Sequence, residues 1–167
     1  MIKYSVFLII ILINVACNQE PKSLPSTDIK TINLTSIRWG ADDLQELSHK
    51  MVQNILASNK IDFTKDKTYF FGNIRNDTHD QIDLKTLQNK IISALLKSSK
   101  FTFIEKDKTR ADYIFKGKIT SIFKKNTNTK DMFFNFNLTL TNTKTLVIVW
   151  SEDIKIRKLY KRSLLSW

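Results

Sequence analysis

The sequence predicts an α+β fold, a single small sandwich in which helices flank a mostly antiparallel sheet. Two stretches repeat apolar residues at helical spacing, and several later stretches alternate apolar and polar residues over strand lengths. Helical and strand segments do not alternate regularly along the chain, as a purely parallel sheet would require. The 167 residues have room for one domain with modest extensions, and their 11 Phe, 4 Tyr and 3 Trp supply a substantial core.

The N-terminus has the pattern of a bacterial lipoprotein signal peptide at residues 1–16. Lys3 precedes the apolar run 6–13, which is too short to span a bilayer. Small residues then precede Cys17, the only cysteine, and Ile13-Asn14-Val15-Ala16-Cys17 resembles a lipobox in which Asn14 replaces the usual Leu. This resemblance implies cleavage before Cys17, lipid attachment to it and, because Asn18 follows, sorting to the outer membrane. The alternative is a buried free cysteine in an apolar N-terminal helix.

A lipid anchor and flexible tether are expected at residues 17–40. The segment contains both prolines, Pro21 and Pro25, among polar residues without a sustained period. Fully stretched, such a tether reaches at most about 75–80 Å. The globular domain is expected at residues 41–158. A tail at 159–167 mixes basic and apolar residues and could be a short helix, a surface-binding tail or a frayed end.

The domain opens with a predicted helix of about 16 residues, capped by Asp42 or Asp43. A strand is expected at residues 67–73, followed by a polar loop at 74–82. Asp83 is expected to cap a second helix. Its apolar face consists of Leu84, Leu87, Ile91, Ile92, Leu95 and Leu96.

Four further strands are predicted, at residues 101–105, 113–124, 132–141 and 146–158. In the second, the alternate residues from Tyr113 to Phe123 share one side, and in the third Phe134, Phe136, Leu138 and Leu140 alternate with polar residues. The last three strands form a meander with turns at residues 126–129 and 142–145. An exposed aromatic residue on the outer face of this meander would be the first candidate for a partner contact.

The residues that enzymes need are sparse. Three isolated glycines build no phosphate loop, Cys17 is assigned to the anchor, and only His49 and His79 are available as histidines. Asp77, His79 and Asp80 could bind a cation, but Asn and Asp before a helix are the usual turn residues, which is the favoured interpretation. We therefore expect no catalytic residue, no cofactor and no metal, and His49 lies off the apolar face of its helix, as a solvated residue would.

The chain is basic, with a formal net charge of +11. A solvated lysine surface is favoured, because no long block of consecutive basic residues occurs. Lys124, Lys125 and Lys130 lie beside Phe133 and Phe134, which could indicate nucleic-acid stacking. A hairpin with lysines at its tip and aromatics in the core is the favoured explanation, so no nucleic-acid partner is expected.

An ordered set of segments resembles the LpoB family of outer-membrane lipoproteins, which activate a bifunctional, class A penicillin-binding protein. The resemblance covers about residues 41–158. It is carried by Ala41–Leu47 with Met51-Val52 and Ile55-Leu56, Phe71–Thr78, Ile82–Leu84, Ser93–Leu96 with Lys100-Phe101, Ala111–Tyr113, Gly117–Ile122, Lys130–Phe136 and Val149-Trp150.

The resemblance implies a domain like the N-terminal domain of TolB and a non-catalytic role in cell-wall synthesis. The domain would face the periplasm, bind a peptidoglycan synthase and stimulate glycan polymerisation and peptide cross-linking, and we expect it to be a monomer. Family members carry a helical stretch where this chain has only residues 106–110, so no contact residues are transferred. Two alternatives stay open: an assembly factor of an envelope or secretion complex with the same fold, and a basic surface lipoprotein that binds polyanions.

Overall fold

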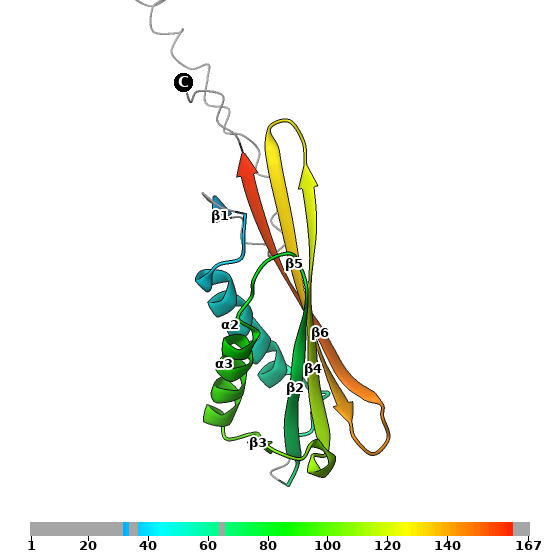
Figure 1. Ribbon diagram of the computed structural model, residues 1–167. Helices are drawn as coiled ribbons and strands as arrows, with labels where there is room; N and C mark the ends of the chain where they lie inside the picture. The colour runs from blue at the N-terminus through cyan, green and yellow to red at the C-terminus, as the bar shows by residue number, and fades with distance from the viewer. Residues whose placement is uncertain (1–31, 34–36, 64–65, 162–167) are drawn as a thin grey trace, which may run out of the picture.

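The computed structural model describes residues 32–33, 37–63 and 66–161 (Figure 1). The predicted signal peptide, Cys17 and most of the tether lie outside these residues. The elements, in chain order, are β1 (Ile32–Asn33), α2 (Ala41–Ala57), β2 (Thr68–Asp77), α3 (Leu84–Lys97), β3 (Thr102–Phe103), the 3-10 helix η1 (Lys108–Arg110), β4 (Tyr113–Lys125), β5 (Thr129–Asn142) and β6 (Ile148–Lys161). They form an α+β fold in which α2 and α3 lie on one side of a single sheet (Figure 1).

The sheet is mixed: its two longest strand pairings are antiparallel, as expected, and the other three pairings are parallel. Its strand order is β1-β6-β5-β4-β2-β3, and only the β4–β5 and β5–β6 pairs are antiparallel. β2 pairs in parallel with β4 because the chain returns through α3 and enters the sheet again in the same direction. The short strands β1 and β3 are likewise parallel to their neighbours.

The predicted loop at residues 74–82 is wrong for its first four residues, because β2 continues to Asp77. The pairing register with β4 shifts between Phe71 and Ile74, where β2 accommodates one extra residue: two residues of β2 lie opposite the single residue Lys116 of β4. A Cβ atom on Gly72 would lie 3.0 Å from the carbonyl oxygen of Phe115, so glycine permits this close approach of the two strands. The irregularity hides the alternation by which a strand is recognised in sequence.

The helix caps follow the sequence in one case and not in the other. Asp83 caps α3 as predicted, and its carboxylate accepts a hydrogen bond from the Thr86 amide at 2.9 Å. The predicted Asp42 or Asp43 cap of α2 is wrong, since the N-cap residue is Gly40. Asp43 lies three residues further on, and its carboxylate accepts a hydrogen bond from the Gly40 amide at 2.7 Å.

The core lies between the helices and the sheet. Leu47, Met51 and Ile55 of α2 are fully buried against it. The predicted inward residues of the middle meander strand, β5, are all buried, which confirms its alternation. The other fully buried large side chains belong to α3, β2 and β4 and include Leu87, Ile91, Leu95, Tyr69, Phe115 and Ile119.

One ion pair lies inside this core. Lys158 of β6 and Asp43 of α2 keep only 4% and 2% of their side-chain surface exposed. The Lys158 ammonium donates both to the Asp43 carboxylate and to the carbonyl oxygen of Arg38. The pair therefore fixes the start of α2 against the end of β6. β6 itself extends to Lys161, so the first three residues of the predicted tail are strand.

Candidate functional site

The candidate site lies on the face of the sheet that the two helices do not cover. Strand side chains alternate between faces, and burying Phe115 and Ile119 toward the helices places Lys116 and Lys118 on the opposite side. Their partners on β5 are Thr139 and Asn137. The open face is consequently built from charged, hydroxyl and amide side chains.

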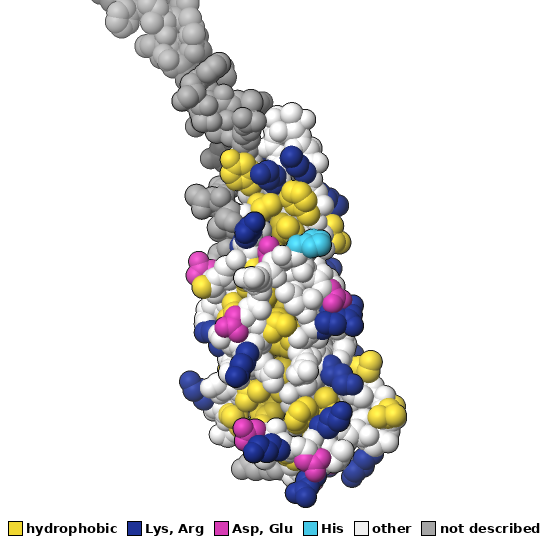
Figure 2. Space-filling view, viewed as in Figure 1, with side chains coloured by type: hydrophobic (Ala, Val, Ile, Leu, Met, Phe, Trp, Pro, Cys, Tyr) yellow, Lys and Arg dark blue, Asp and Glu magenta, His cyan; other side chains and the backbone are white. Residues whose placement is uncertain are grey.

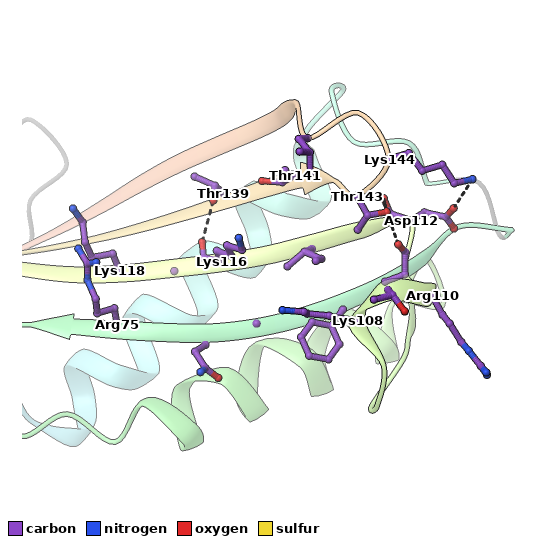
Figure 3. A pocket seen from close by; sticks show the side chains of 18 of the residues that line it. Arg75, Lys108, Arg110, Asp112, Lys116, Lys118, Thr139, Thr141, Thr143 and Lys144 are labelled. Atoms are coloured by element: carbon purple, nitrogen blue, oxygen red, sulfur yellow. Dashed lines mark hydrogen bonds and ion pairs between the residues drawn. The ribbon is translucent and has the colours of Figure 1, made fainter.

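A concavity of about 1010 Å³ occupies this face (Figure 3). It is lined by β2, η1, β4, β5 and the β5–β6 turn (residues 143–147), with Phe70 and Ile114 supplying apolar surface. Asp112 is the one carboxylate among the described residues that line it. Six cationic side chains also line the concavity: Arg75, Lys108, Arg110, Lys116, Lys118 and Lys144.

Half of these cations have no carboxylate partner. Among the described residues, no acidic side chain lies within ion-pair distance of Lys108, Lys116 or Lys118. Arg75 and Lys118 are paired across β2 and β4, so two like charges face each other at the middle of the sheet. Such a pair destabilises an isolated sheet, and its presence here favours a role in binding negative charge.

The other three cations form exposed ion pairs at the edge of the concavity. Arg75 lies 2.9 Å from Asp77. Arg110 lies 3.2 Å from Asp107, and the Lys144–Asp112 separation is 3.9 Å. The cationic side chains of these pairs are 68%, 80% and 83% exposed. Because exposed ion pairs contribute little to stability, these cations can pair with an anionic partner instead with little loss of folding free energy.

Asp112 has a structural role at the rim. Its carboxylate accepts hydrogen bonds from the amide and the hydroxyl of Thr68, both at 3.0 Å, and thereby joins the start of β2 to the start of β4. These hydrogen bonds, with a smaller contribution from the charge of Lys144, lower the pKa of the Asp112 carboxyl. The Asp112 carboxylate is therefore engaged at the rim, and its single negative charge offsets only a part of the positive charge of the surrounding cations.

The β5–β6 turn at one end of the concavity exposes apolar side chains. Leu146, Val147 and the adjoining Ile148 are 77%, 57% and 59% exposed. Leu146 has a φ of +59°, in the left-handed region that glycine and asparagine favour. Figure 2 shows hydrophobic and basic side chains together at this lower end of the sheet.

The basic hairpin considered in the sequence lies at the opposite end of the sheet and does not reach the concavity (Figure 1). Phe134 is buried in the core as predicted, whereas Phe133 lies on the open face. The guanidinium of Arg157 covers the Phe133 ring at 5.1 Å, and Lys124 lies 5.8 Å from the same ring. Phe123 is the exposed aromatic residue of this hairpin, at 50% exposure.

The polar cluster after β2 is occupied by turn hydrogen bonds. The side-chain amide of Asn76 donates to the backbone carbonyl of Asp80 at 2.8 Å, and the Asp80 carboxylate accepts from the backbone amide of Trp39 at 3.0 Å. Asp77 pairs with Arg75, while His79 and His49 are exposed. In the described part of the chain, no three potential metal-ligating side chains gather in one place.

The concavity was not predicted from the sequence. Lys116 and Lys118 flank Gly117 on the polar side of an alternating strand, which is a signal for an outward basic pair. The contributions of Arg75, Lys108 and Lys144 could not be found this way, because the parallel β2–β4 pairing and the fold of η1 bring them together only in space.

The fold and this surface together define a small α+β domain with a basic, open sheet face. The sequence model of the family described as peptidoglycan-synthase activator LpoB matches residues 43–111 and 106–156. The chain therefore belongs to the LpoB family, as the resemblance in sequence indicated. A search among curated proteins finds no match.

Solved structures of this family are similar to the chain. The LpoB C-terminal domain from Escherichia coli is 15% identical, with a TM-score of 0.47, and the alignment covers 68% of this chain and 98% of that domain. The corresponding Salmonella enterica domain is 16% identical, with a TM-score of 0.43 and coverage of 68% and 94%. The NMR structure of Escherichia coli LpoB is 14% identical, with a TM-score of 0.45 and coverage of 89% of each chain.

Proposed function

We propose that this protein is a non-catalytic activator of a peptidoglycan synthase, a class A penicillin-binding protein. The observation that carries the proposal is the family match, which extends over nearly the whole described domain. An activator of this kind binds one conformation of its partner more tightly than another and so shifts the partner toward its active state. It needs a docking surface and no catalytic groups of its own.

The open sheet face is the surface best suited to that docking. Its six cations exceed its one carboxylate among the described residues, so it complements an acidic protein surface. Charge complementarity accelerates encounter and excludes partners of the wrong charge. Phe70 and Ile114 supply apolar surface, and burying that surface against a partner contributes favourably to the free energy of binding.

The proposal includes a lipid anchor at Cys17 that holds the protein at the outer membrane with its domain in the periplasm. Two or more acyl chains are needed for stable attachment, and a lipobox cysteine receives them. Within the described residues, no helix is long and apolar enough to cross a membrane. Replacing Cys17 by Ala should leave the domain folded and release it from the membrane fraction; membrane retention of that variant would contradict the anchor.

The function is tested with the class A penicillin-binding protein encoded in the same genome. Glycan polymerisation and peptide cross-linking by the purified synthase are measured with and without the full chain. We expect a saturable stimulation of both, with no polymerisation by this protein alone. No binding and no stimulation would contradict the proposal, and capture of secretion or envelope-assembly components from solubilised envelopes would then favour an assembly factor.

A further inference from the structure

The β5–β6 turn combines a disfavoured backbone conformation with an exposed apolar side chain. Leu146 occupies the left-handed region at φ +59°, where its Cβ is unfavourable and glycine or asparagine would fit without strain. Its side chain is also 77% exposed, so burial in the domain does not explain a leucine at this position. Neither the local backbone nor the core accounts for this residue.

The turn is nevertheless tightly held. The Leu146 amide donates to the carbonyl of Asn142, and the Asn142 amide donates to the carbonyl of Val147, both at 2.9 Å. The Asn142 side-chain oxygen accepts hydrogen bonds from the amides of Lys144 and Thr145, each at 3.0 Å. The conformation that presents Leu146 to solvent is therefore preorganised before any partner arrives.

A second set of hydrogen bonds fixes the turn to the rim of the concavity. The hydroxyl of Thr143 donates to the carbonyl of Ala111 at 2.6 Å, and its amide donates to the carbonyl of Asp112 at 2.9 Å. Strained residues persist where the surrounding structure holds them, and they concentrate at functional sites. A rigid apolar element also loses less entropy on binding than a flexible one.

The surroundings of Leu146 define the partner. Val147 and Ile148 extend the exposed apolar surface, and Lys144 and Arg110 lie at the same end of the concavity with their side chains 83% and 80% exposed. A complementary surface is an apolar pocket with carboxylates around its edge. Energetically dominant contacts commonly consist of an apolar anchor in a pocket with polar groups around it.

The position of the turn leaves it accessible. The described chain begins at β1, beside the C-terminal end of β6, whereas the β5–β6 turn lies at the opposite end of the sheet (Figure 1). A partner that approaches this turn therefore meets the domain at the end of the sheet away from β1.

We infer that the β5–β6 turn is the anchor by which this protein docks on its synthase. Leu146, with Val147, enters an apolar pocket of the partner, and carboxylates around that pocket pair with Lys144 and Arg110. The inference rests on the proposed function and deepens it, because it assigns the contact surface and the chemistry of the partner surface.

The test replaces Leu146 by Gly in the full-length protein. This change removes the apolar side chain and also relieves the left-handed strain, so we expect equal or higher thermal stability together with weaker binding. Affinity for the purified synthase should fall about 30-fold, as for loss of a dominant apolar contact. Leu146→Asn should behave in the same direction.

Two control variants match the two parts of the change. Ser99 has a φ of +58° beyond the end of α3, so Ser99→Gly relieves similar strain far from the turn. Leu96 on α3 is 48% exposed, so Leu96→Ala removes another exposed apolar side chain. Both controls should bind the synthase within about twofold of the parent protein.

Lys144→Glu tests the charged part of the contact. This variant should bind the synthase about tenfold more weakly than the parent protein, chiefly through slower association.

Several results would overturn the inference. If both Leu146→Gly and Leu146→Asn bind the synthase within about twofold of the parent protein, Leu146 is not the docking anchor. The proposed activation of the synthase would be unaffected by that result. Marked thermal destabilisation of both variants would show that Leu146 serves the fold. A parent protein that neither binds nor stimulates the synthase would contradict the proposed function itself, and the anchor assignment would fall with it.

Discussion

The two faces of the sheet differ in how much of their composition the fold requires. The covered face buries Phe115, Phe134 and Phe136 completely under the helices, and its one ion pair is closed off from water. The open face carries Lys116 and Lys118 without carboxylate partners among the described residues. The covered face thus accounts for stability, and the open face holds charge that stability does not need.

The difference between the two faces indicates where a binding surface is to be sought in this domain. Residues that satisfy the core are explained by burial. In contrast, Arg75 lies opposite the like charge of Lys118, and Leu146 combines a left-handed backbone with an exposed apolar side chain, so burial explains neither. Departures of this kind are expected at binding surfaces. Substitutions on the two faces should therefore separate folding from partner binding.

The largest effect on stability is expected from Phe136→Ala. Phe136 is fully buried on β5, and removing its ring should cost about 3–5 kcal/mol in free energy of unfolding. Thr139→Ala on the open face of the same strand is the control; it removes one exposed hydrogen bond to the Lys116 carbonyl and should cost no more than about 1 kcal/mol. Denaturant unfolding measures both, and similar losses in the two variants would contradict the contrast between the faces.

The second prediction concerns the buried ion pair of the covered face. Among the described residues, Asp43→Ala leaves the buried Lys158 ammonium with the Arg38 carbonyl as its acceptor. We expect a loss of about 3 kcal/mol, because an uncompensated buried charge is costly. The double variant Asp43→Leu with Lys158→Met should be more stable than Asp43→Ala. Equal stability of the double variant and Asp43→Ala would show that the unpaired Lys158 ammonium is not the cause of the loss.

A smaller, pH-dependent effect is expected from Asp112 at the rim. Hydrogen bonds from Thr68 lower its pKa in the folded state, so its contribution to stability is present above the pKa of the unfolded chain. That contribution is lost as the pH falls through the lowered pKa. Asp112→Asn should therefore narrow the difference in melting temperature between neutral and acidic pH. An unchanged difference would contradict the role assigned to Asp112.

The sequence predicted the covered face better than the open one. The alternation of Phe134 to Leu140 and the Asp83 cap depend on local patterns, and both are as expected. The extension of β2 is not predicted because one additional residue near Gly72 interrupts the alternation of the strand. The cap of α2 was misplaced because Asp43 acts from inside the helix instead of preceding it.

The site escaped prediction for a different reason. Lys108, Lys116 and Lys144 belong to three separate segments, and only the parallel entry of β2 and the return of the β5–β6 turn place them around one concavity. The distribution of charge along the chain indicates a basic protein, but it does not indicate which surface of the domain carries the positive charge. The lysines that stand out in the sequence, Lys124 and Lys125, are adjacent along the chain and lie outside the concavity.

The most direct test of the account reverses charge on the open face alone. The full-length variant Lys116→Glu with Lys118→Glu is compared with Lys85→Glu with Lys97→Glu, which changes two exposed lysines of α3. Both should keep the stability of the parent protein to within about 1 kcal/mol. We expect only the open-face variant to lose stimulation of the synthase, with binding at least about tenfold weaker at low salt. Full stimulation by that variant, at the affinity of the parent protein, would show that the open face is not the docking surface.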